Sequence, residues 1–580
     1  MAAENQTSEI VVDRGKWEWS ELWKKEDWWA IWLGCAILIA GLFIFLPRPP
    51  EGMLEKIDKA EAIMAAEEAR APFRTIEWHQ GNDSTSGLKA RNEPHGKTIA
   101  RWLAFPGRWS SNPLESIYLD KEGAEARNAK AMPAFEEAQV KTKAALEEAK
   151  QAQEMAAGAG FTNPELNKSA ATAISAWRKA REAEKKAGDK TKIKPYNKLP
   201  YLVGAMVLFM LFFSIGTKFL NISTSGFMKG FWFIFLLAVL AEIIGNNSTL
   251  RHYGFGSIIW AILGGMLISN TVGTPNFVKP ALQTEYFIKT GLVLLGAEIL
   301  FSKLVAIGIP GIFVAWVVTP TVLCLTYWFG QNVLKMESKT LNMTVSADMS
   351  VCGVSAAIAT AAACRAKKEE LTIAIGMSML FTAVMMIAMP TFIVAVGMHP
   401  VLGGAWIGGT IDATGAVVAA GAFLGETGMF VAATIKMIQN VLIGIIAFSV
   451  AVYWCAKVEC APDQKVSPME IWYRFPKFVL GFIGASIVFS IIFTSMGGAG
   501  EVMLDQGVLR GLSRPCREWF FILAFASIGL SSDFREMAHH FKGGKPAILY
   551  VCGQSLNLAL TLLAAYVMFF LVFPNITAGL

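Results

Sequence analysis

The sequence has few charged residues for its length. Of its 580 residues, 17% are charged and 54% are hydrophobic, and the mean hydropathy is +0.43. A soluble globular chain normally carries about a quarter charged residues. The formal net charge of +6 is small for this length, so nucleic acid is not an expected partner. A modest basic surplus is typical of loops at a lipid surface, so the lipid bilayer is the first expected partner.

Residue types that build metal, redox and nucleotide sites are also scarce. None of the eight cysteines lies between residues 50 and 198, which argues against a disulfide scaffold. The six histidines fall in polar segments or at predicted helix ends, so no haem or metal site is expected within the membrane. The segment HGKT at 95–98 has Arg91 where an ATP-binding loop requires glycine. No cofactor is therefore expected, and a gradient would drive any transport.

Long apolar runs occupy most of the chain. Residues 11–29 mix tryptophan with lysine, which suits the membrane interface, with an amphipathic soluble helix as the alternative. The apolar run 30–47 lacks a cleavage pattern. We therefore predict that residues 1–47 form an interfacial segment and a first, uncleaved span that starts in the cytoplasm.

Twelve further runs follow, each near the roughly 20 residues that cross a bilayer. Their approximate bounds are 200–217, 227–245, 255–271, 284–306, 309–330, 340–364, 370–396, 401–424, 428–456, 475–496, 515–533 and 545–573. Together with the first span they give thirteen candidates. We predict that residues 199–580 form one compact, multi-pass transporter domain.

Residues 48–198 interrupt the membrane character. Residues 121–190 are rich in Ala, Glu and Lys, the composition of long exposed helices. Gly158 and Gly160 are predicted to end one helix, and Asn163 to cap the next, with Pro164 in its first position. The region is expected to form an extramembrane α-helical hairpin that packs on the transporter or, in a homodimer, on a second copy. A flexible solvated arm is the alternative.

One apolar stretch, residues 340–366, has a polar centre. Asp348, Ser350, Cys352, Gly353 and Ser355 gather small and polar groups in its middle. Irregular backbone survives in a membrane only inside protein or beside a cavity, so this pattern predicts a broken helix. A second half beginning at 352–355 would offer free N–H groups and a partial positive charge to an anion. The alternative is close helix packing through small residues.

A second stretch, residues 408–422, repeats this pattern. Two glycines precede Thr410, Asp412, Thr414 and Gly415, and an apolar helical tract follows. A lone acid in a membrane segment is costly, so Asp412 is expected to face a cavity or a partner. It would bind Na⁺ or H⁺, or position a donor. The structural alternative is that Asp412 caps its own half-helix.

A lysine lies inside the next apolar run. Lys436 is followed by Gln439 and Asn440, and these spacings place all three side chains on one helical face. Lys436 is expected either to complement an anionic substrate or to neutralise an acid. The alternative is a lysine that extends to the membrane surface from one end of a tilted helix. Cys352 has no histidine near it in the sequence, so no catalytic residue is assigned and an enzyme is not expected.

The segments at 350–363 and 410–422 resemble each other, as do those at 292–304 and 525–537. Each pair places polar or small residues at matching points. Paired interruptions of this kind indicate the substrate site of a transporter built from repeats.

Several segments resemble the YeiH-type family, to which sulfate export is attributed. They are SVCGVSAAIA at 350–359, GTIDATGAVVAAGA at 409–422, KTGLVLLGAEIL at 289–300, FASIGL at 525–530 and KKEDWWAIWLG at 24–34, together with Lys436. The resemblance covers residues 200–573 and the first span. It implies an inner-membrane secondary transporter similar in fold to cation/proton antiporters and bile-acid-type symporters. Two departures are the long insert at 48–198 and the residues 412–415, which differ from many members.

The expected fold is therefore an all-α polytopic membrane protein. It would be an inverted-repeat secondary transporter with two broken crossing helices and an extramembrane hairpin. The expected substrate is a small anion, either sulfate or a related sulfur oxyanion or sulfonate, moved by alternating access in the bacterial inner membrane.

Each candidate residue has an expected role in this transport. The substrate-binding residues are Ser350, Cys352, Gly353, Ser355, Thr410, Thr414, Gly415 and Lys436, and Asp348 and Asp412 would couple transport to H⁺ or Na⁺. A cation/proton antiporter is the second hypothesis. A membrane-anchored assembly protein is the third.

Overall fold

The computed structural model describes residues 10–11, 18–252, 255–458, 467–535 and 544–579. The chain divides into two compact units. Unit 1 comprises Met1–Leu38, Met206–Ile491 and Cys516–Leu580, and unit 2 comprises Ile39–Ala205 and Ile492–Pro515. Part of the predicted interfacial segment, residues 12–17, lies outside the described residues.

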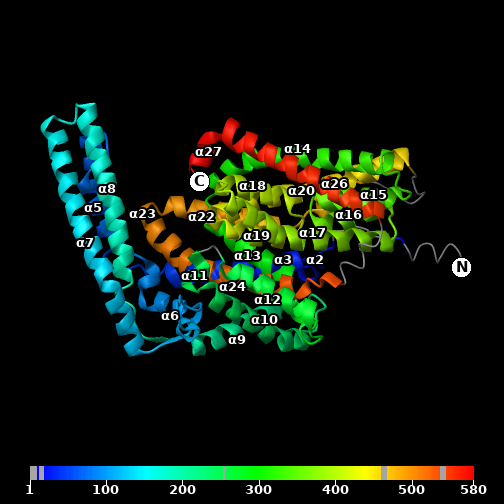
Figure 1. The fold of residues 1–580 in the computed structure, drawn as a ribbon, viewed down its shortest axis with the longest axis horizontal. Helices are drawn as coiled ribbons and strands as arrows, with labels where there is room; N and C mark the ends of the chain where they lie inside the picture. Colours follow the sequence, from blue (N-terminus) through cyan, green and yellow to red (C-terminus); the bar gives the residue numbers. More distant parts are fainter. Residues whose placement is uncertain (1–9, 12–17, 253–254, 459–466, 536–543, 580) are drawn as a thin grey trace. The chain divides into compact units, whose positions relative to one another are not determined.

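Unit 1 is helical and contains most of the apolar runs (Figure 1). Helices α3, α9, α22 and α24 have residues in both units. The helices are α2 (Glu21–Lys24), α3 (Glu26–Phe45), α9 (Leu199–Thr217), α10 (Thr224–Gly245), α11 (Ser248–His252), α12 (Ser257–Thr271), α13 (Thr284–Glu298), α14 (Phe301–Asn332), α15 (Lys339–Ser350), α16 (Gly353–Cys364), α17 (Lys368–Ala395), α18 (Pro400–Thr410), α19 (Thr414–Phe423), α20 (Gly425–Lys457), α21 (Met469–Arg474), α22 (Phe478–Ser495), α24 (Arg514–Ser531), α26 (Gly544–Tyr566) and α27 (Pro574–Gly579), with a 3₁₀ turn η3 (Lys279–Ala281) and a π-helix η5 (Val567–Val572).

Eight of the thirteen predicted spans are helices long and apolar enough to cross a membrane. Within the described residues these are α3, α9, α10, α14, α17, α20, α22 and α26 with η5. The remaining five runs are also helical, but each departs from a simple span. Two of them are interrupted, α12 and α13 have only 15 residues each, and α24 carries charged residues in its first turns. The chain is thus an all-α polytopic membrane protein, and eight of its thirteen candidate spans are long, apolar helices among the described residues.

The predicted boundary between the spans 284–306 and 309–330 is wrong. Helix α13 ends at Glu298, and α14 already begins at Phe301. Two serines of α22 hold this junction. Ser486 Oγ donates to Ile299 O at 2.6 Å, and Ser490 Oγ accepts from Phe301 N at 2.7 Å. The helix can break there because a neighbouring helix supplies partners for the freed backbone groups.

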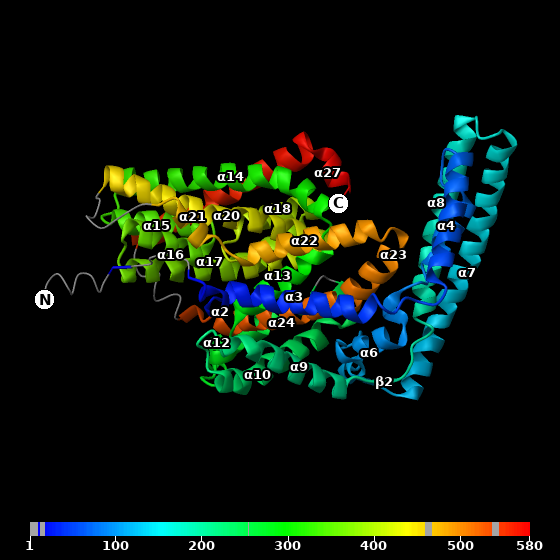
Figure 2. The ribbon, with the colours of Figure 1, turned by 180° about the vertical axis from the view of Figure 1, so that it is seen from behind.

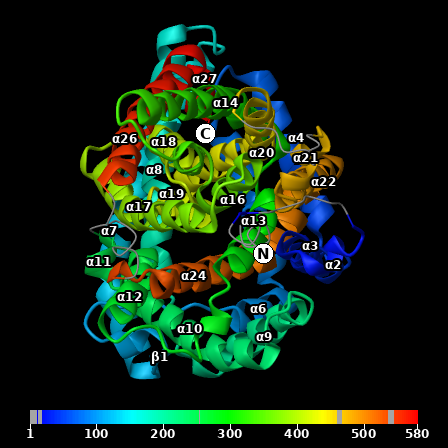
Figure 3. The same cartoon turned by 90° about the vertical axis from the view of Figure 1, so that its right-hand side faces the viewer.

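Helix α20 is central to the group of helices that holds the interruptions. It lies against α14, α16, α18 and α19 (Figure 1). Helices α10 and α12 lie side by side elsewhere in unit 1 (Figure 3). The backbones of α12 and α24 lie so close together that a Cβ added at Gly265 would be 2.6 Å from Leu530 N. Small residues permit such close packing of membrane helices.

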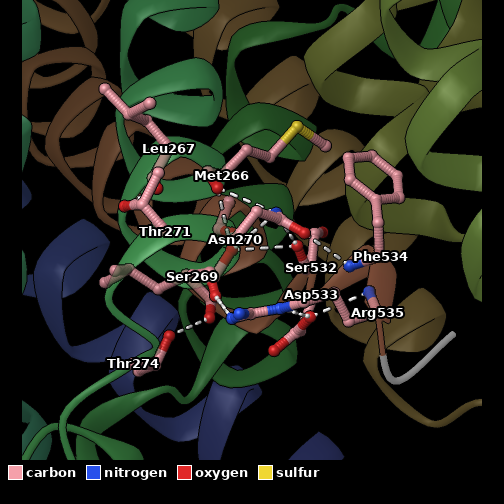
Figure 4. A network of polar contacts seen from close by, with 12 residues as sticks. Met266, Leu267, Ser269, Asn270, Thr271, Thr274, Ser532, Asp533, Phe534 and Arg535 are labelled. Carbon is pink, nitrogen blue, oxygen red and sulfur yellow. Dashed lines mark hydrogen bonds and ion pairs between the residues drawn. The ribbon is translucent and has the colours of Figure 1, made fainter.

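A polar network joins the ends of α12 and α24 (Figure 4). Asn270 Nδ2 donates to Ser532 O at 2.8 Å, and Asn270 Oδ1 accepts from Phe534 N at 2.7 Å. Ser269 Oγ lies 2.9 Å from Ser532 O, and Thr274 Oγ1 donates to Leu530 O. These side chains satisfy carbonyl groups at the end of α24, which the helix itself leaves without partners. The network therefore fixes one helix end against another.

Unit 2 consists of a helical hairpin and shorter elements around it (Figure 2). The elements wholly within it are α4 (Met53–Arg70), α5 (Ile76–Thr85), η1 (Ala90–Asn92), α6 (Pro94–Trp102), η2 (Pro113–Ser116), β1 (Tyr118–Leu119), α7 (Lys121–Gly158), α8 (Pro164–Asp189), β2 (Tyr196–Asn197), α23 (Gly498–Gly500) and a π-helix, η4 (Glu501–Ser513). Strands β1 and β2 pair antiparallel, with Tyr118 opposite Asn197.

The hairpin forms where its sequence signals lie. Helix α7 ends at Gly158, and Asn163 caps α8 by accepting hydrogen bonds from the backbone N–H groups of Glu165 and Leu166. Its core combines Trp177 of α8 with Ile76 of α5 and apolar residues of α7. These contacts tie α5 to both long helices.

We expect Trp177→Ala to destabilise unit 2 strongly. Trp177 is 2% exposed, and removing a buried tryptophan leaves a cavity that costs about 3–5 kcal/mol. Hydrogen exchange of the α7 and α8 amides should therefore accelerate in the full-length variant. Lys179→Ala on the exposed side of α8 is the matched control and should leave exchange unchanged. Equal exchange in both variants would contradict this role for Trp177.

Candidate functional site

Two helices of unit 1 are interrupted where the sequence predicts breaks. Helix α15 ends at Ser350 and α16 begins at Gly353, and α18 ends at Thr410 and α19 begins at Thr414. Gly353 has φ +35°, a value that side chains disfavour. The polar centres predicted from sequence therefore coincide with real interruptions.

The two interruptions touch each other. Cys352 Sγ lies 3.9 Å from Thr414 Oγ1. A Cβ added at Gly353 would lie 3.4 Å from Asp412 Cβ and 3.0 Å from Ser378 Oγ. Only a residue without a side chain fits this approach without displacing its neighbours. The breaks thus meet at one point, as in a crossing of two broken helices.

Side chains of α20 donate hydrogen bonds to backbone carbonyl groups at the ends of α15 and α18, the first halves of the two interrupted helices. Lys436 Nζ donates to Val351 O and to Gln439 Oε1, both at 2.8 Å. Gln439 Nε2 lies 3.0 Å from Ser350 O and 3.2 Å from Gly409 O. The last carbonyls of a helix have no partner within it, and inside a membrane they need one from elsewhere. One amide thus serves both broken helices.

Helix α26 provides two more donors. Gln554 Nε2 donates to Thr410 O at 3.0 Å, and Asn557 Nδ2 donates to Met349 O at 3.3 Å. Both side chains are buried. Neither residue is among those predicted for the site from the sequence. Their signal was the spacing of polar residues in α26 at positions 550, 554, 557 and 561, which places them on one helical face.

The two predicted acids lie at the crossing in different environments. Asp412 Oδ2 accepts hydrogen bonds from the Tyr550 hydroxyl and, at 3.5 Å, from Ser378 Oγ. Asp348 is 0% exposed, and neither of its carboxyl oxygens has a hydrogen-bond partner among the described residues. A buried charge without a partner is very costly. Asp348 is therefore suited to hold a proton or to meet a cation.

The alternative that Asp412 caps its own half-helix is wrong. The N-cap of α19 is Ala413, and no side chain caps this helix. The N-cap of α16, Cys352, likewise makes no side-chain cap. The first N–H groups of both second halves are therefore not satisfied by a capping side chain.

Both uncapped helix ends line one cleft of about 460 Å³. Cys352 and Ser355 line it from the start of α16, Thr414 from the start of α19, and Asn440 from α20. Asn440 Nδ2 also donates to Thr414 Oγ1 at 3.1 Å. Two helix N-termini facing one space concentrate partial positive charge and N–H donors there.

Ionic side chains line another part of the cleft, and most of the described ones are paired with an opposite charge, whereas Lys477 Nζ donates to the backbone carbonyls of Trp472 and Phe475. Lys289 Nζ lies 2.8 Å from Glu26 Oε1 and 2.9 Å from Asp27 Oδ1. Asp27 also accepts from Lys477 N at 2.7 Å. Lys25 and Arg474, which line the same cleft, pair with Glu21 and Glu470. Attraction for an anion therefore comes from the helix ends and from Lys477, whose charge no described carboxylate pairs.

The predicted site residues divide into three groups. Cys352, Ser355 and Thr414 line the cleft, while Gly353, Asp348, Asp412 and Lys436 lie at or beside the crossing. The remaining three, Ser350, Thr410 and Gly415, make contacts within the protein. The Ser350 and Thr410 hydroxyls donate to carbonyls of their own helices, and a Cβ added at Gly415 would meet Ile288. Lys436 is 1% exposed, so the alternative that it extends to the membrane surface is wrong.

We expect Gly353→Ala to destabilise the protein by about 1–3 kcal/mol, because the added methyl group would combine backbone strain with contact to Ser378. Thermal unfolding of detergent-solubilised protein, followed by tryptophan fluorescence, measures the loss. Gly484→Ala in α22 is the control, since its Cβ would meet no atom within 4 Å. A midpoint for Gly353→Ala as high as that of the control would show that the break does not need glycine.

We expect Gln439→Met to lower the same unfolding midpoint. The variant keeps the side-chain length but removes the donor to two buried carbonyls, at roughly 1–3 kcal/mol for each group left unsatisfied. Ser449→Ala, an exposed change on the same helix, should leave the midpoint unaltered. An unchanged midpoint in Gln439→Met would mean that the two breaks do not depend on this amide.

Comparison with known proteins places the chain in a family. The family model described as "Conserved hypothetical protein 698" matches residues 229–550. A UPF0324 membrane protein of Nitratidesulfovibrio vulgaris is 60% identical over 99% of this chain and its own whole length. No solved structure matches the chain.

The share of the chain that is covered differs among the relatives. A UPF0324 membrane protein of Rhodopirellula baltica is 42% identical over 97% of this chain and 92% of its own length. One of Nitrosomonas europaea is 31% identical, but covers 56% of this chain and 74% of its own length. The chain belongs to the UPF0324 family of membrane proteins, which is the YeiH-type family that its sequence resembles.

Proposed function

We propose that this membrane protein is a secondary transporter of a small anion, either sulfate or a related sulfur oxyanion or sulfonate. The observation that carries the proposal is the cleft into which both second half-helices, α16 and α19, direct their uncapped N-termini. Hydroxyl groups of Ser355 and Thr414 lie in the same lining. Backbone N–H groups and hydroxyls are suitable donors for an oxyanion.

The two acids at the crossing would couple the anion to H⁺ or Na⁺. Asp348, whose carboxyl oxygens have no hydrogen-bond partner in the part of the chain that the structure describes, would accept the coupling ion. Asp412, held by Tyr550 and Ser378, would keep the crossing in place and share the charge. Ionisable groups buried in membrane helices typically mark ion pathways.

Alternating access would complete the transport cycle. The two crossing helices would belong to inverted repeats, and motion of one group of helices against the other would expose the cleft to each side of the bacterial inner membrane in turn. Lys436 would contribute by holding the interrupted backbone at Val351, with its charge close to both acids.

A cation/proton antiporter is the second candidate, and one observation favours it. Asp348 is a buried carboxyl group with free acceptor oxygens, which a cation would satisfy directly. In that case the cleft would serve as the entry path, and Lys436 would balance the charge of the two acids between ions.

Uptake into proteoliposomes separates the two candidates. The purified full-length chain is reconstituted, and labelled sulfate, sulfite and a sulfonate are supplied under imposed pH or Na⁺ gradients. Anion uptake above that of empty liposomes supports the main proposal. Proton flux that depends on Na⁺ or K⁺, without uptake of any anion, would instead establish the antiporter.

We expect Asp348→Asn to uncouple uptake from the ion gradient. The amide cannot take part in a proton or cation cycle, so imposed gradients should no longer accelerate anion uptake, whereas ligand-induced thermal stabilisation by the anion should remain. Asp189→Asn, an exposed change in α8, is the control and should behave like the wild type. Gradient-driven uptake by Asp348→Asn at the wild-type rate would exclude Asp348 from coupling.

A further inference from the structure

Unit 2 contains an open pocket of about 330 Å³ that the transport proposal does not use. Arg74, just before α5, and His79 within it line one wall, and Arg178 of α8 lines another. Ala171, Ile174 and Ser175 complete the lining. Every side chain of the pocket belongs to unit 2, so its geometry is set within that unit alone.

The pocket has more positive than negative charge. Arg178 and Arg181 share one carboxylate, with NH1 atoms 2.6 Å and 3.0 Å from Asp83 Oδ2. Arg74 makes no ion pair with any described residue, and its guanidinium lies 4.3 Å from the centre of the Trp78 ring. The pocket lining therefore holds the guanidinium groups of Arg74 and Arg178 and no acid, and Arg181, outside the lining, shares Asp83 with Arg178.

The aromatic residues hold these cations in position. Arg181 lies over Trp177 at 5.4 Å and Arg178 at 5.9 Å. Stacking on an aromatic face fixes the plane of a guanidinium and leaves its edge available for hydrogen bonds. The edge is the part of arginine that binds oxyanions in a bidentate manner.

The pKa of His79 is lowered by burial and in part by the positive charge of the same arginines. Burial lowers the pKa of His79, and Arg178, Arg74 and Arg181 lower it further, while only Asp83 raises it. The lowered pKa of His79 thus agrees with a positive field at this point, because protonation would add a further positive charge beside the arginines.

We propose that this pocket binds a small oxyanion group, such as sulfate, phosphate or a carboxylate, between Arg74, His79 and Arg178. The volume of about 330 Å³ accommodates such a group with several waters. The site is separate from the cleft of unit 1 and does not depend on the protein being a transporter.

Binding of an oxyanion is expected to be coupled to protonation of His79. A bound oxyanion opposes the field of Arg74, Arg178 and Arg181, so the pKa of His79 rises toward or above its ordinary value. Since the bound form then holds a proton that the empty form lacks, binding takes up protons and strengthens as the pH falls toward the pKa of empty His79. Asp83 remains the one carboxylate facing this histidine.

The test is a pH titration of His79 by NMR. Full-length protein in non-ionic detergent is labelled in its six histidines, and the His79 signal is identified by its loss in His79→Gln. Sulfate or inorganic phosphate is added, with chloride at the same ionic strength as the comparison. The pKa of His79 is expected to rise with the oxyanions and not with chloride.

Variants decide whether the arginine pocket is responsible. Arg74→Gln removes the arginine that has no acidic partner and should weaken oxyanion binding by about tenfold or more. Arg74→Lys keeps the charge without the planar fork and should give an intermediate loss. Lys179→Gln, which removes an exposed charge outside the pocket from α8, the helix of Arg178, should bind like the wild type.

Two results would overturn the site. One is a His79 shift of the same size with chloride, which would reflect screening alone. The other is undiminished binding in Arg74→Gln. A shift in nanodiscs of anionic lipid without any added oxyanion would support the site and identify the phosphate as that of a lipid headgroup; a shift only after addition would identify a free anion.

Discussion

Backbone groups that leave a helix inside a membrane must find partners in the protein, and this requirement explains most of the structure around the crossing. The carbonyl ends of α15 and α18 are buried, and each receives hydrogen bonds from helices far away in the sequence. The donors are Lys436, Gln439, Gln554 and Asn557. These polar side chains would be costly to bury alone, so the interrupted backbone and its donors stabilise one another.

The carbonyl ends and the N–H ends of the broken helices at the crossing differ in their hydrogen-bond partners. Carbonyl groups on one side are satisfied by side chains, whereas the N-termini of α16 and α19 on the other side have no capping side chain and open on a cleft. The protein thus neutralises the negative ends of the helix dipoles internally and leaves the positive ends accessible. This asymmetry is the main support for an anion in the cleft, while Asp348 is the main support for a coupled cation or proton.

Much of this was predictable from local sequence. A polar centre in an apolar run indicates a break, and both breaks lie where residues 348–355 and 410–415 predicted them. What sequence could not supply was the direction of each side chain. The hydroxyls of Ser350 and Thr410 turn to their own helices, and the early start of α14 depends on serines of α22, which are distant in sequence. Such partners are set by tertiary contacts.

The position of Gln439 has a mechanical consequence. Its single amide group reaches the end of α15 and the end of α18 at once. Separating these two ends would leave a buried carbonyl without its partner, at a cost of roughly 1–3 kcal/mol. The crossing is therefore expected to travel as one rigid body together with α20. In the proposed transport cycle a hinge would lie outside this crossing, where the ion pairs of Lys289 with Glu26 and Asp27 link α13 to α3.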